Sequence, residues 1–415
     1  MFQAPRGTYD LLPLKAEGLR AFLNKAIAVL EKAGFVELET PILEEARLFN
    51  RSVGEGSDIV TKEMYTFRDK KGRLLALRPE GTAPIVRAYL EHHLFYSNPS
   101  ARFYYYGPMF RYDRPQKGRY RQFLQLGVEV FASAYPHTDA EVIFLLYEIL
   151  SQGGIEKFKV KLNNLGCRKC QKGYEKRLSG FLEGQKKKLC GDCQIRLKKN
   201  PLRTFDCKVE DCQEVLSGAP TISNFLCRDC QNHFQEVLDL LEILNVKYQR
   251  EERLVRGLDY YTRTVWEATA GDRKDAIAAG GRYDNLVADL GGPEIPALGF
   301  AIGLERVLEL LPLPQPQERR GVRFIYLGAA ARKKMLALLC SLRRLVSVPV
   351  TISPEEKSLK SQLRLADKDR CLLAIIAGTN ELERGVFTIR NLANGHQQEV
   401  KEAELIERIT KCCGQ

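Results

Sequence analysis

The feature that most restricts the fold of this 415-residue chain is a pair of strand-like segments that flank a short, turn-rich break. Residues 102–107 and 123–131 are rich in aromatic and β-branched side chains, and residues 114–118 between them include proline and glycine. Aromatic and β-branched residues favour strands, whereas proline and glycine favour turns. The pattern therefore predicts a long antiparallel hairpin.

The second segment of this hairpin separates its side chains onto two faces. Within residues 124–130 the even positions are all apolar, whereas the odd positions include Gln125 and Glu129. If the hairpin turns in the middle of the break, Arg111 lies opposite Arg121, and both arginines share the polar face. Two cations beside a carboxylate and an amide suit an anionic substrate that also carries a cationic group. A solvent-facing sheet surface with ion pairs is the alternative that this pattern leaves open.

The positive charge of the chain is concentrated in one stretch. Residues 157–203 contain 15 basic and 3 acidic residues, so this stretch alone accounts for the net charge of +12. A basic block of this density is typical of a surface that binds a polyanion. A solvated, charged helical surface is the simpler alternative.

Cysteine is concentrated in nearly the same stretch. The spacing predicts metal ligation, because disulfides are rare in proteins without a secretory segment. Eight thiols suffice for two tetrahedral, closed, structural zinc sites. Reduced thiols in a helical module are the alternative. The four pairs are Cys167 and Cys170, Cys190 and Cys193, Cys207 and Cys212, and Cys227 and Cys230.

The chain is expected to divide into two domains. A Pro-rich polar segment near residue 311 predicts a boundary between residues 1–320 and 321–415. The Cys-rich, basic stretch from about 155 to 248 differs in composition from both flanks, so we expect an insertion within the first domain. Strands that alternate with helices predict a small α/β second domain. Helices are expected at 19–33, 331–346 and 359–366, and strands at 35–39, 254–267, 322–327, 348–352 and 372–377.

Several short segments, in the right order, resemble the motifs of class II aminoacyl-tRNA synthetases in their histidyl form. They predict an α+β first domain with an antiparallel sheet. The resemblance covers residues 1 to about 312 and, more loosely, the second domain, which is similar to a class IIa anticodon-binding domain. The segments are TPIL at 40–43 (motif 1), LRPEGT at 77–82 (amino-acid loop), FRYDRPQKGRYRQF at 110–123 (motif 2), VRGLDYYT at 255–262 and AGGRYD at 279–284 (histidine signatures), and GFAIGLER at 299–306 (motif 3).

The resemblance implies a role for each motif residue. Arg111 and Arg256 are the expected catalytic residues, because negative charge grows on the phosphoryl oxygens when the histidine carboxylate attacks the α-phosphorus of ATP. The resemblance assigns histidine binding to Glu80, Gly81, Thr82, Arg111, Gln125, Glu129, Arg256, Tyr260, Tyr261 and Tyr283. It assigns ATP binding to Arg111, Asp113, Arg121, Gly303 and Arg306.

The same resemblance implies the partners of the chain. They are L-histidine, ATP with Mg²⁺, tRNA(His) and a second copy of the chain in a homodimer. The chain shows no secretory pattern, and its longest apolar run is far shorter than the roughly 20 residues of a membrane span, so a cytoplasmic protein without a membrane partner is expected. The alternatives are a non-catalytic regulatory paralogue from histidine biosynthesis, which typically lacks the 255–262 signature, and a zinc-ribbon RNA-binding protein.

Overall fold

The computed structural model of this protein contains two compact units, residues 1–313 and residues 314–415. The structure describes residues 2–54, 57, 59–271, 275–312 and 319–413. The domain boundary expected from the sequence falls in the Pro-rich segment, of which residues 313–318 lie outside the described residues.

The centre of the first unit is an eight-stranded sheet. Its six inner strands pair antiparallel, and the first and last strands add in parallel. The α+β fold with an antiparallel sheet is therefore confirmed. The strand order is β1 (Val36–Glu37), β5 (Arg102–Phe110), β6 (Gln122–Phe131), β11 (Ala297–Gly303), β10 (Ala278–Arg282), β9 (Thr262–Ala270), β7 (Phe158–Asn164) and β8 (Tyr248–Arg250).

The hairpin formed by β5 and β6 has the register that the sequence predicts. The main-chain N–H of Arg111 donates to the carbonyl of Arg121 at 2.9 Å, just beyond the paired strands. Leu126 and Val128 are fully buried on the apolar face. Gln125 and Glu129 therefore point to the opposite face, because successive side chains of a strand alternate.

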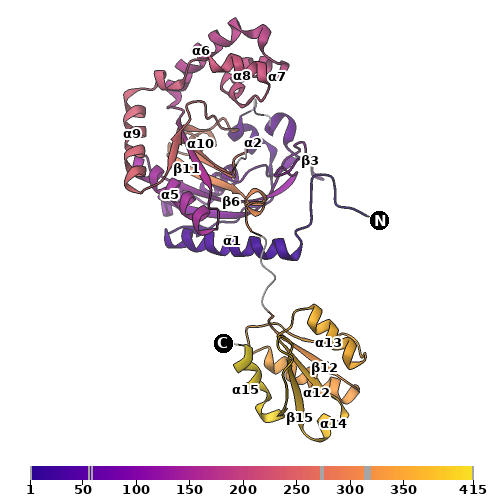
Figure 1. The fold of residues 1–415 in the computed structure, drawn as a ribbon. Helices are drawn as coiled ribbons and strands as arrows, with labels where there is room; N and C mark the ends of the chain where they lie inside the picture. The colour runs from indigo at the N-terminus through magenta and orange to yellow at the C-terminus, as the bar shows by residue number, and fades with distance from the viewer. Residues whose placement is uncertain (1, 55–56, 58, 272–274, 313–318, 414–415) are drawn as a thin grey trace. The chain divides into compact units, whose positions relative to one another are not determined.

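Three helices cover the apolar face of this sheet: α1 (Pro13–Lys32), α5 (Pro136–Gln152) and α9 (Arg228–Ile243) (Figure 1). Helix α1 begins with a proline, whose missing N–H costs nothing in a first helical turn. Its Phe22, Ala26 and Leu30 recur at helical spacing and are buried against the sheet. The helix expected at 19–33 is therefore confirmed and begins earlier.

The opposite face of the sheet carries smaller elements and is only partly covered. A three-stranded sheet and several short helices surround the open part of this face. They are α2 (Ala46–Val53), the π-helical turn η1 (Ile59–Glu63), α3 (Thr82–Glu91), α4 (Leu94–Ser97) and α10 (Leu286–Asp289), with strands β2 (Leu43–Glu45), β4 (Leu74–Leu77) and β3 (Thr66–Arg68). The short helix α11 (Leu304–Leu308) follows β11 and buries Leu304 and Val307 in the core on the apolar face.

The Cys-rich insertion is shorter than the expected range of about 155–248. Strands β7 and β8 pair within the main sheet, and the apolar side chains of β7 and α9 pack in the core of the first unit. These elements therefore do not belong to the insertion. The strand expected from residue 254 begins only at Thr262, since residues 254–261 form a loop. The insertion lies at the top of Figure 1 and contains α6 (Arg168–Gly184), η2 (Lys186–Lys188), α7 (Gly191–Lys199), η3 (Pro201–Asp206), α8 (Glu210–Ser217) and η4 (Ile222–Phe225).

The second unit is a five-stranded mixed sheet with helices, which confirms the expected α/β character. Its parallel strands are β13 (Val350–Ile352), β12 (Val322–Tyr326) and β14 (Leu373–Ala377), and the antiparallel pair β15 (Val386–Asn391) and β16 (Gln397–Lys401) completes it. The helices are α12 (Ala329–Leu342), α13 (Leu359–Lys368), α14 (Thr379–Glu383) and α15 (Glu402–Cys413). Across the described residues, no helix is both long and apolar enough to cross a bilayer.

Candidate active site

The open face of the large sheet contains a cavity of about 610 Å³. Its walls come from the hairpin β5–β6, the loop before α3, the loop before β9, strands β10 and β11, and α11. Twelve of the residues singled out from the sequence line it: Glu80, Gly81, Thr82, Arg111, Asp113, Gln125, Arg256, Tyr260, Tyr261, Tyr283, Gly303 and Arg306. The structure thus brings together residues from all five motifs that the sequence suggested for substrate binding.

Glu129 lies buried directly behind one wall of the cavity. Thr82 Oγ1 donates a hydrogen bond to Glu129 Oε1 at 2.7 Å, and the hydroxyl of Tyr283 donates to the other carboxylate oxygen. Burial raises the pKa of Glu129 to about 8, although these two hydrogen bonds lower it. Glu129 therefore holds a proton over most of the neutral pH range.

The proton on Glu129 should make the stability of the first unit depend on pH. We expect the free energy of unfolding of this unit to fall as pH rises from 6 to 8. The folded state keeps a proton on Glu129 up to about pH 8, whereas an unfolded Glu releases it near pH ~4.3, so unfolding releases a proton in this window. The contribution is complete below the unfolded pKa, is lost as pH rises through the folded pKa, and amounts to at most about 1.4 kcal/mol per pH unit.

The variant Glu129→Gln should flatten this dependence, because an amide is neutral and still offers partners to Thr82 and Tyr283. The fluorescence of Trp266, the only tryptophan in the chain, reports denaturant unfolding of the first unit because this side chain is fully buried there. Glu214→Gln, at an exposed position, is the control. Equal pH slopes in Glu129→Gln and the native chain would contradict the assignment.

Glu80 and Gly81 shape the end of the cavity near α3. The Glu80 carboxylate accepts hydrogen bonds from the main-chain N–H groups of Thr82 and Ala83 at 2.7 and 2.9 Å, at the start of that helix. Burial raises its pKa despite these bonds. Gly81 touches the ring of Tyr105 so closely that any side chain at this position would collide with it.

Three polar atoms in the wall are buried without a hydrogen-bond partner among the described residues: Gln125 Oε1, Arg256 Nε and the Tyr260 hydroxyl oxygen. Buried polar groups in folded proteins are normally paired, because an unpaired one costs about 1–3 kcal/mol. All three belong to cavity-lining residues. The cavity is therefore built for a polar ligand that supplies these partners.

The two arginines expected to be catalytic both lie in the cavity wall. Arg111 is held by one hydrogen bond from Nε to the carbonyl of Pro79 at 2.8 Å, and its guanidinium lies 5.3 Å from the ring centre of Phe123. Burial lowers the pKa of Arg111. Arg256 Nη1 donates to Glu267 Oε2 at 3.0 Å. Two cations so arranged favour an anion in the cavity.

At the other end of the cavity, the helix α11 presents Arg306. Leu304 and Val307 of this helix are fully buried, which leaves Arg306 on the face toward the cavity, as predicted. Its Nε donates to the carbonyl of Gly118 at 3.0 Å, and Nη1 donates to the carbonyl of Ala276. The guanidinium plane is thus fixed by main-chain contacts and offers a flat surface.

Arg121 does not line the cavity, although the sequence pattern grouped it with Arg111. Its guanidinium lies 3.8 Å from the ring centre of Tyr112, and Nε donates to the carbonyl of Asp113 at 3.4 Å. Arg119, which the sequence reasoning passed over, lines the cavity and lies 3.3 Å from both Asp113 and Asp275. Strand alternation cannot place either arginine, because the ladder ends before them.

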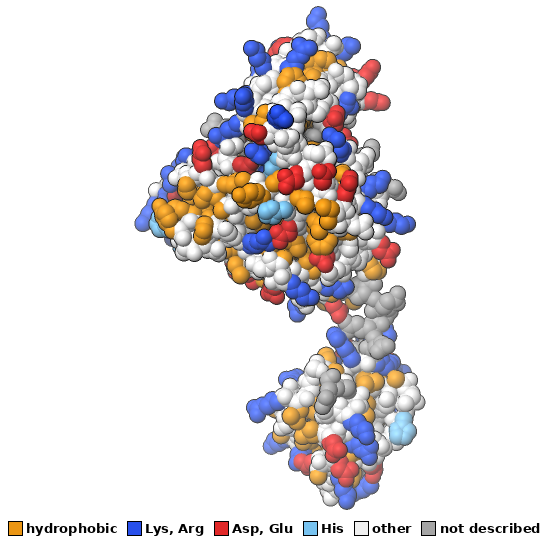
Figure 2. Space-filling model, turned by 90° about the vertical axis from the view of Figure 1, so that its left-hand side faces the viewer, with side chains coloured by type: hydrophobic (Ala, Val, Ile, Leu, Met, Phe, Trp, Pro, Cys, Tyr) orange, Lys and Arg blue, Asp and Glu red, His pale blue; other side chains and the backbone are white. Residues whose placement is uncertain are grey.

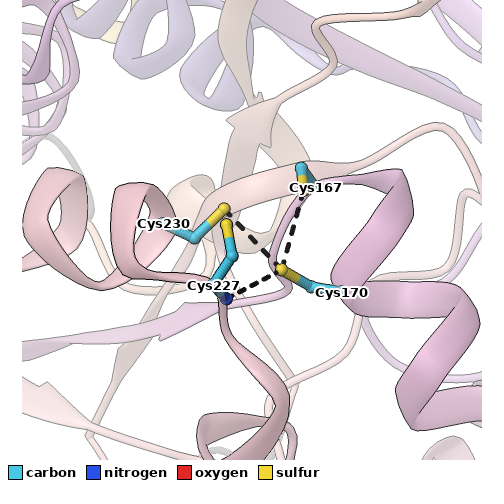
Figure 3. A group of neighbouring side chains, drawn as sticks. All are labelled: Cys167, Cys170, Cys227 and Cys230. Carbon is cyan, nitrogen blue, oxygen red and sulfur yellow. Dashed lines mark hydrogen bonds between the residues drawn. The ribbon is translucent and has the colours of Figure 1, made fainter.

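Eight cysteines gather into two groups of four, each with all sulfur atoms within 4.8 Å of one another. The outer group, formed by the first and last pairs along the chain, joins the starts of α6 and α9 (Figure 3). The inner group, formed by the two middle pairs, lies within the insertion. Sulfur pairs lie 3.6, 4.0 and 3.8 Å apart, near the edge of about 3.8 Å in a tetrahedron with Zn–S bonds of about 2.3 Å. The outer group is Cys167, Cys170, Cys227 and Cys230, and the inner group is Cys190, Cys193, Cys207 and Cys212.

The local structure of these groups favours thiolates at the helix starts, whereas burial opposes them at the cysteines inside the helices. Cys167, Cys190 and Cys227 each immediately precede a helix, where main-chain N–H groups and the helix dipole stabilise negative charge. The N–H of Cys227 donates to the sulfur of Cys170 at 3.1 Å. Burial raises the pKa of Cys230, so a nearby cation is needed to keep all four sulfurs ionised. The donor set therefore fits zinc, and both groups could hold it.

The fold and site together define a class II aminoacyl-tRNA synthetase. Arg111 lies at the end of the β5–β6 hairpin, and Arg306 lies on the short helix α11 that follows β11. These are the positions expected for motif 2 and motif 3. The family described as histidyl-tRNA synthetase matches residues 7–170 and 197–307, and the anticodon binding domain matches residues 325–411. The chain belongs to the histidyl-tRNA synthetase family.

Individual relatives agree with this assignment. The chain is 46% identical to a histidine–tRNA ligase of Desulfosudis oleivorans over 96% of both chains, and 45% identical to one of Aquifex aeolicus over 97% of this chain and 99% of the relative. Among solved structures, the apo histidyl-tRNA synthetase of S. aureus has a TM-score of 0.82 and 32% identity, with 98% of this chain and 99% of that chain covered. Both units are therefore shared with the family.

Proposed function

We propose that this protein is an ATP-dependent histidine–tRNA ligase that forms histidyl-adenylate and then transfers histidine to the 3′ end of tRNA(His). The observation that carries the proposal is the set of unpaired polar atoms in a cavity lined by Arg111 and Arg256. The regulatory paralogue is disfavoured, because the chain has both the 255–262 loop and a segment that matches an anticodon binding domain.

In the activation step, a carboxylate oxygen of histidine forms a bond to the α-phosphorus of ATP, and the bond to the β-phosphate oxygen breaks. Pyrophosphate leaves with that oxygen. Arg111 and Arg256 stabilise the negative charge that grows on the α-phosphoryl oxygens. Main-chain and ion-pair contacts hold both guanidinium groups before the substrates bind, so little reorganisation is needed.

Histidine specificity follows from the buried end of the cavity. We assign the imidazole to Glu129 and Tyr261, and the α-ammonium group to Glu80, Thr82 and Gln125. Tyr260 and Tyr283 pack edge to face, with ring centres 5.6 Å apart, and close this end. A smaller or apolar side chain would leave the buried polar groups unpaired, which is the strongest basis for rejection of an analogue.

ATP occupies the other end in this proposal. Arg306 stacks on the adenine beside Gly303, and Arg119 and Asp113 lie near the phosphates and the base. The support is that Arg306 and Arg119 line the cavity and are fixed by contacts from separate loops. We assign no ATP contact to Arg121, because it lies outside the cavity. ATP enters as its Mg²⁺ complex, whose metal ion neutralises phosphate charge.

The transfer step requires tRNA(His), whose terminal ribose hydroxyl attacks the carbonyl of the adenylate and releases AMP. Basic side chains are spread over the insertion at the top of Figure 2. We propose that this surface contacts the acceptor end of tRNA through backbone phosphates. The exposed lysines of the insertion are Lys169, Lys172, Lys176, Lys187, Lys188, Lys198, Lys199 and Lys208. We also propose that the chain acts in the cytoplasm as a homodimer.

A charging assay tests this function. The native chain with ATP, histidine and a tRNA(His) transcript should form histidyl-tRNA, while a transcript with another anticodon and acceptor end should stay uncharged. Charging of both transcripts alike, or of neither, would contradict the proposal.

We also propose that both cysteine groups hold structural zinc. Purified protein should contain about two zinc ions per chain, because each group supplies four thiolates in tetrahedral reach. Cys190→Ser and Cys227→Ser should each lower the metal content to about one ion, as measured by elemental analysis. Cys340→Ser, at an exposed position outside both groups, is the control. A folded, metal-free chain that charges tRNA at the native rate would contradict this assignment.

A further inference from the structure

One short segment of the insertion reaches into the active-site cavity. Arg203 and Asp206 of η3, and Lys208 just after it, line the cavity beside residues of the main sheet. The roles proposed above use none of these three residues. The insertion therefore takes part in the wall of the site itself.

Arg203 contacts the loop that carries Arg256. Its side chain is only 7% exposed, and Nη1 donates to the main-chain carbonyl of Arg256 at 3.1 Å. The same nitrogen donates to Oδ2 of Asp206 at 3.1 Å, and Nε lies 3.8 Å from Oδ1 of Asp259. One buried guanidinium thus touches both ends of the segment 256–259.

The inner cysteine group fixes the segment that carries Arg203. Cys207 follows η3 directly, and its N–H donates to the carbonyl of Thr204 at 3.0 Å. Its sulfur lies 3.8 Å from that of Cys190, which immediately precedes α7. Gln213 of α8 donates to the carbonyl of Cys207. The two helices α7 and α8 therefore converge on the residue that ends the Arg203 turn.

The insertion meets the same loop at a second point. Gln171 Nε2 of α6 donates to the carbonyl of Tyr261 at 2.9 Å. Gln171 follows Cys170 of the outer group directly in the chain. Each cysteine group therefore adjoins a residue that contacts the loop of Arg256 and Tyr261. For the outer group this residue is Gln171, and for the inner group it is Arg203.

We propose that Arg203, held by the inner cysteine group, is a positioning residue for histidine activation and acts through the main chain of Arg256. The proposal rests on the proposed function, because the position of Arg256 matters only if it meets the α-phosphate. A main chain fixed before substrate binds lets the guanidinium reach its transition-state position without an ordering cost. The insertion is then part of the activation machinery as well as a surface for tRNA.

The test is histidine-dependent ATP–pyrophosphate exchange, which needs no tRNA. We expect Arg203→Met to lower kcat by roughly tenfold, with a smaller change in the KM for histidine, because it loosens Arg256 but removes no substrate contact. Arg203→Lys should recover part of the rate, since an ammonium group can still donate to the Arg256 carbonyl. Arg177→Met, which changes an exposed arginine of the same insertion, should leave the rate unchanged.

A double-mutant cycle distinguishes positioning from an independent contribution. If Arg203 acts through Arg256, then Arg203→Met should have little further effect in an Arg256→Ala background. An equal fold-loss in both backgrounds would overturn the proposal, and so would native kcat in Arg203→Met.

Hydrogen exchange of the unliganded protein gives a readout that does not depend on activity. Peptides over residues 254–261 should exchange faster in Arg203→Met and in Cys190→Ser, while peptides over β10 keep the native rate. Unchanged exchange over 254–261 in both variants would overturn the proposal. The variants could show this faster hydrogen exchange while the native protein catalyses no histidine-dependent ATP–pyrophosphate exchange. That result would contradict the proposed function and leave the structural link intact.

Discussion

Replacing Arg256 with alanine is expected to lower the kcat of histidine-dependent ATP–pyrophosphate exchange by about 10²–10³-fold. Arg256 lines the cavity, and its buried Nε has no partner among the described residues. Glu267 therefore orients the guanidinium group through Nη1, while Nε can still donate a hydrogen bond to the ligand. A preorganised donor that meets charge only in the transition state contributes to kcat more than to KM.

The measurement is steady-state exchange over a range of histidine concentrations. Arg253→Ala is the matched control, because this nearby arginine is exposed and does not line the cavity. Arg256→Lys should restore only part of the rate, since one ammonium group cannot reproduce the fork of guanidinium donors. A variant Arg256→Ala with near-native kcat and a raised KM would mean that Arg256 binds the ground state, which would contradict a role in the transition state.

The largest expected effect on stability comes from Arg282 and Asp139, whose side chains are both fully buried. Arg282 Nη2 lies 2.6 Å from Asp139 Oδ2, and its Nη1 donates to the carbonyl of Ser133 at 2.8 Å. Burial alone would raise the pKa of Asp139, but the charge of Arg282 and the hydrogen bonds from His233 and Arg282 more than offset this and lower it. The pair joins the end of β10 to the start of α5.

Arg282→Met should therefore lower the free energy of unfolding of the first unit by about 3–5 kcal/mol, because it removes the cation that is paired with the buried carboxylate of Asp139. Denaturant unfolding followed by Trp266 fluorescence measures this change. Arg73→Met is the control, since its ion pair with Asp69 is exposed on the arginine side, and we expect a loss below about 1 kcal/mol. Similar losses in the two variants would show that the buried pair adds nothing beyond a surface one.

The sequence was most informative where regular structure carries the site. Alternation along β6 placed Gln125 and Glu129 on the polar face, and the helical stripe of α11 placed Arg306 toward the cavity. These predictions succeeded because a strand or helix converts spacing along the chain into direction in space. Arg121 lies opposite Arg111 as predicted but outside the paired strands, and its side chain packs on the ring of Tyr112 instead of lining the cavity.

Contacts between distant segments were beyond the reach of sequence patterns. The spacing showed four cysteine pairs, but it could not show that the first and last pairs join while the two inner pairs form a second group. The contact of Arg203 with the carbonyl of Arg256 depends on that same long-range folding. The bounds of the insertion were also too wide, because the basic composition runs into β7, which belongs to the main sheet.

The most direct test of histidine activation by this site is ATP–pyrophosphate exchange by the native chain with each of the twenty amino acids in turn. We predict exchange with histidine alone, because the proposed imidazole partners Glu129 and Tyr261 are buried, and a side chain that cannot pair with them would leave them without a ligand partner. Exchange with none of the amino acids, or faster exchange with one other than histidine, would contradict histidine activation by this site.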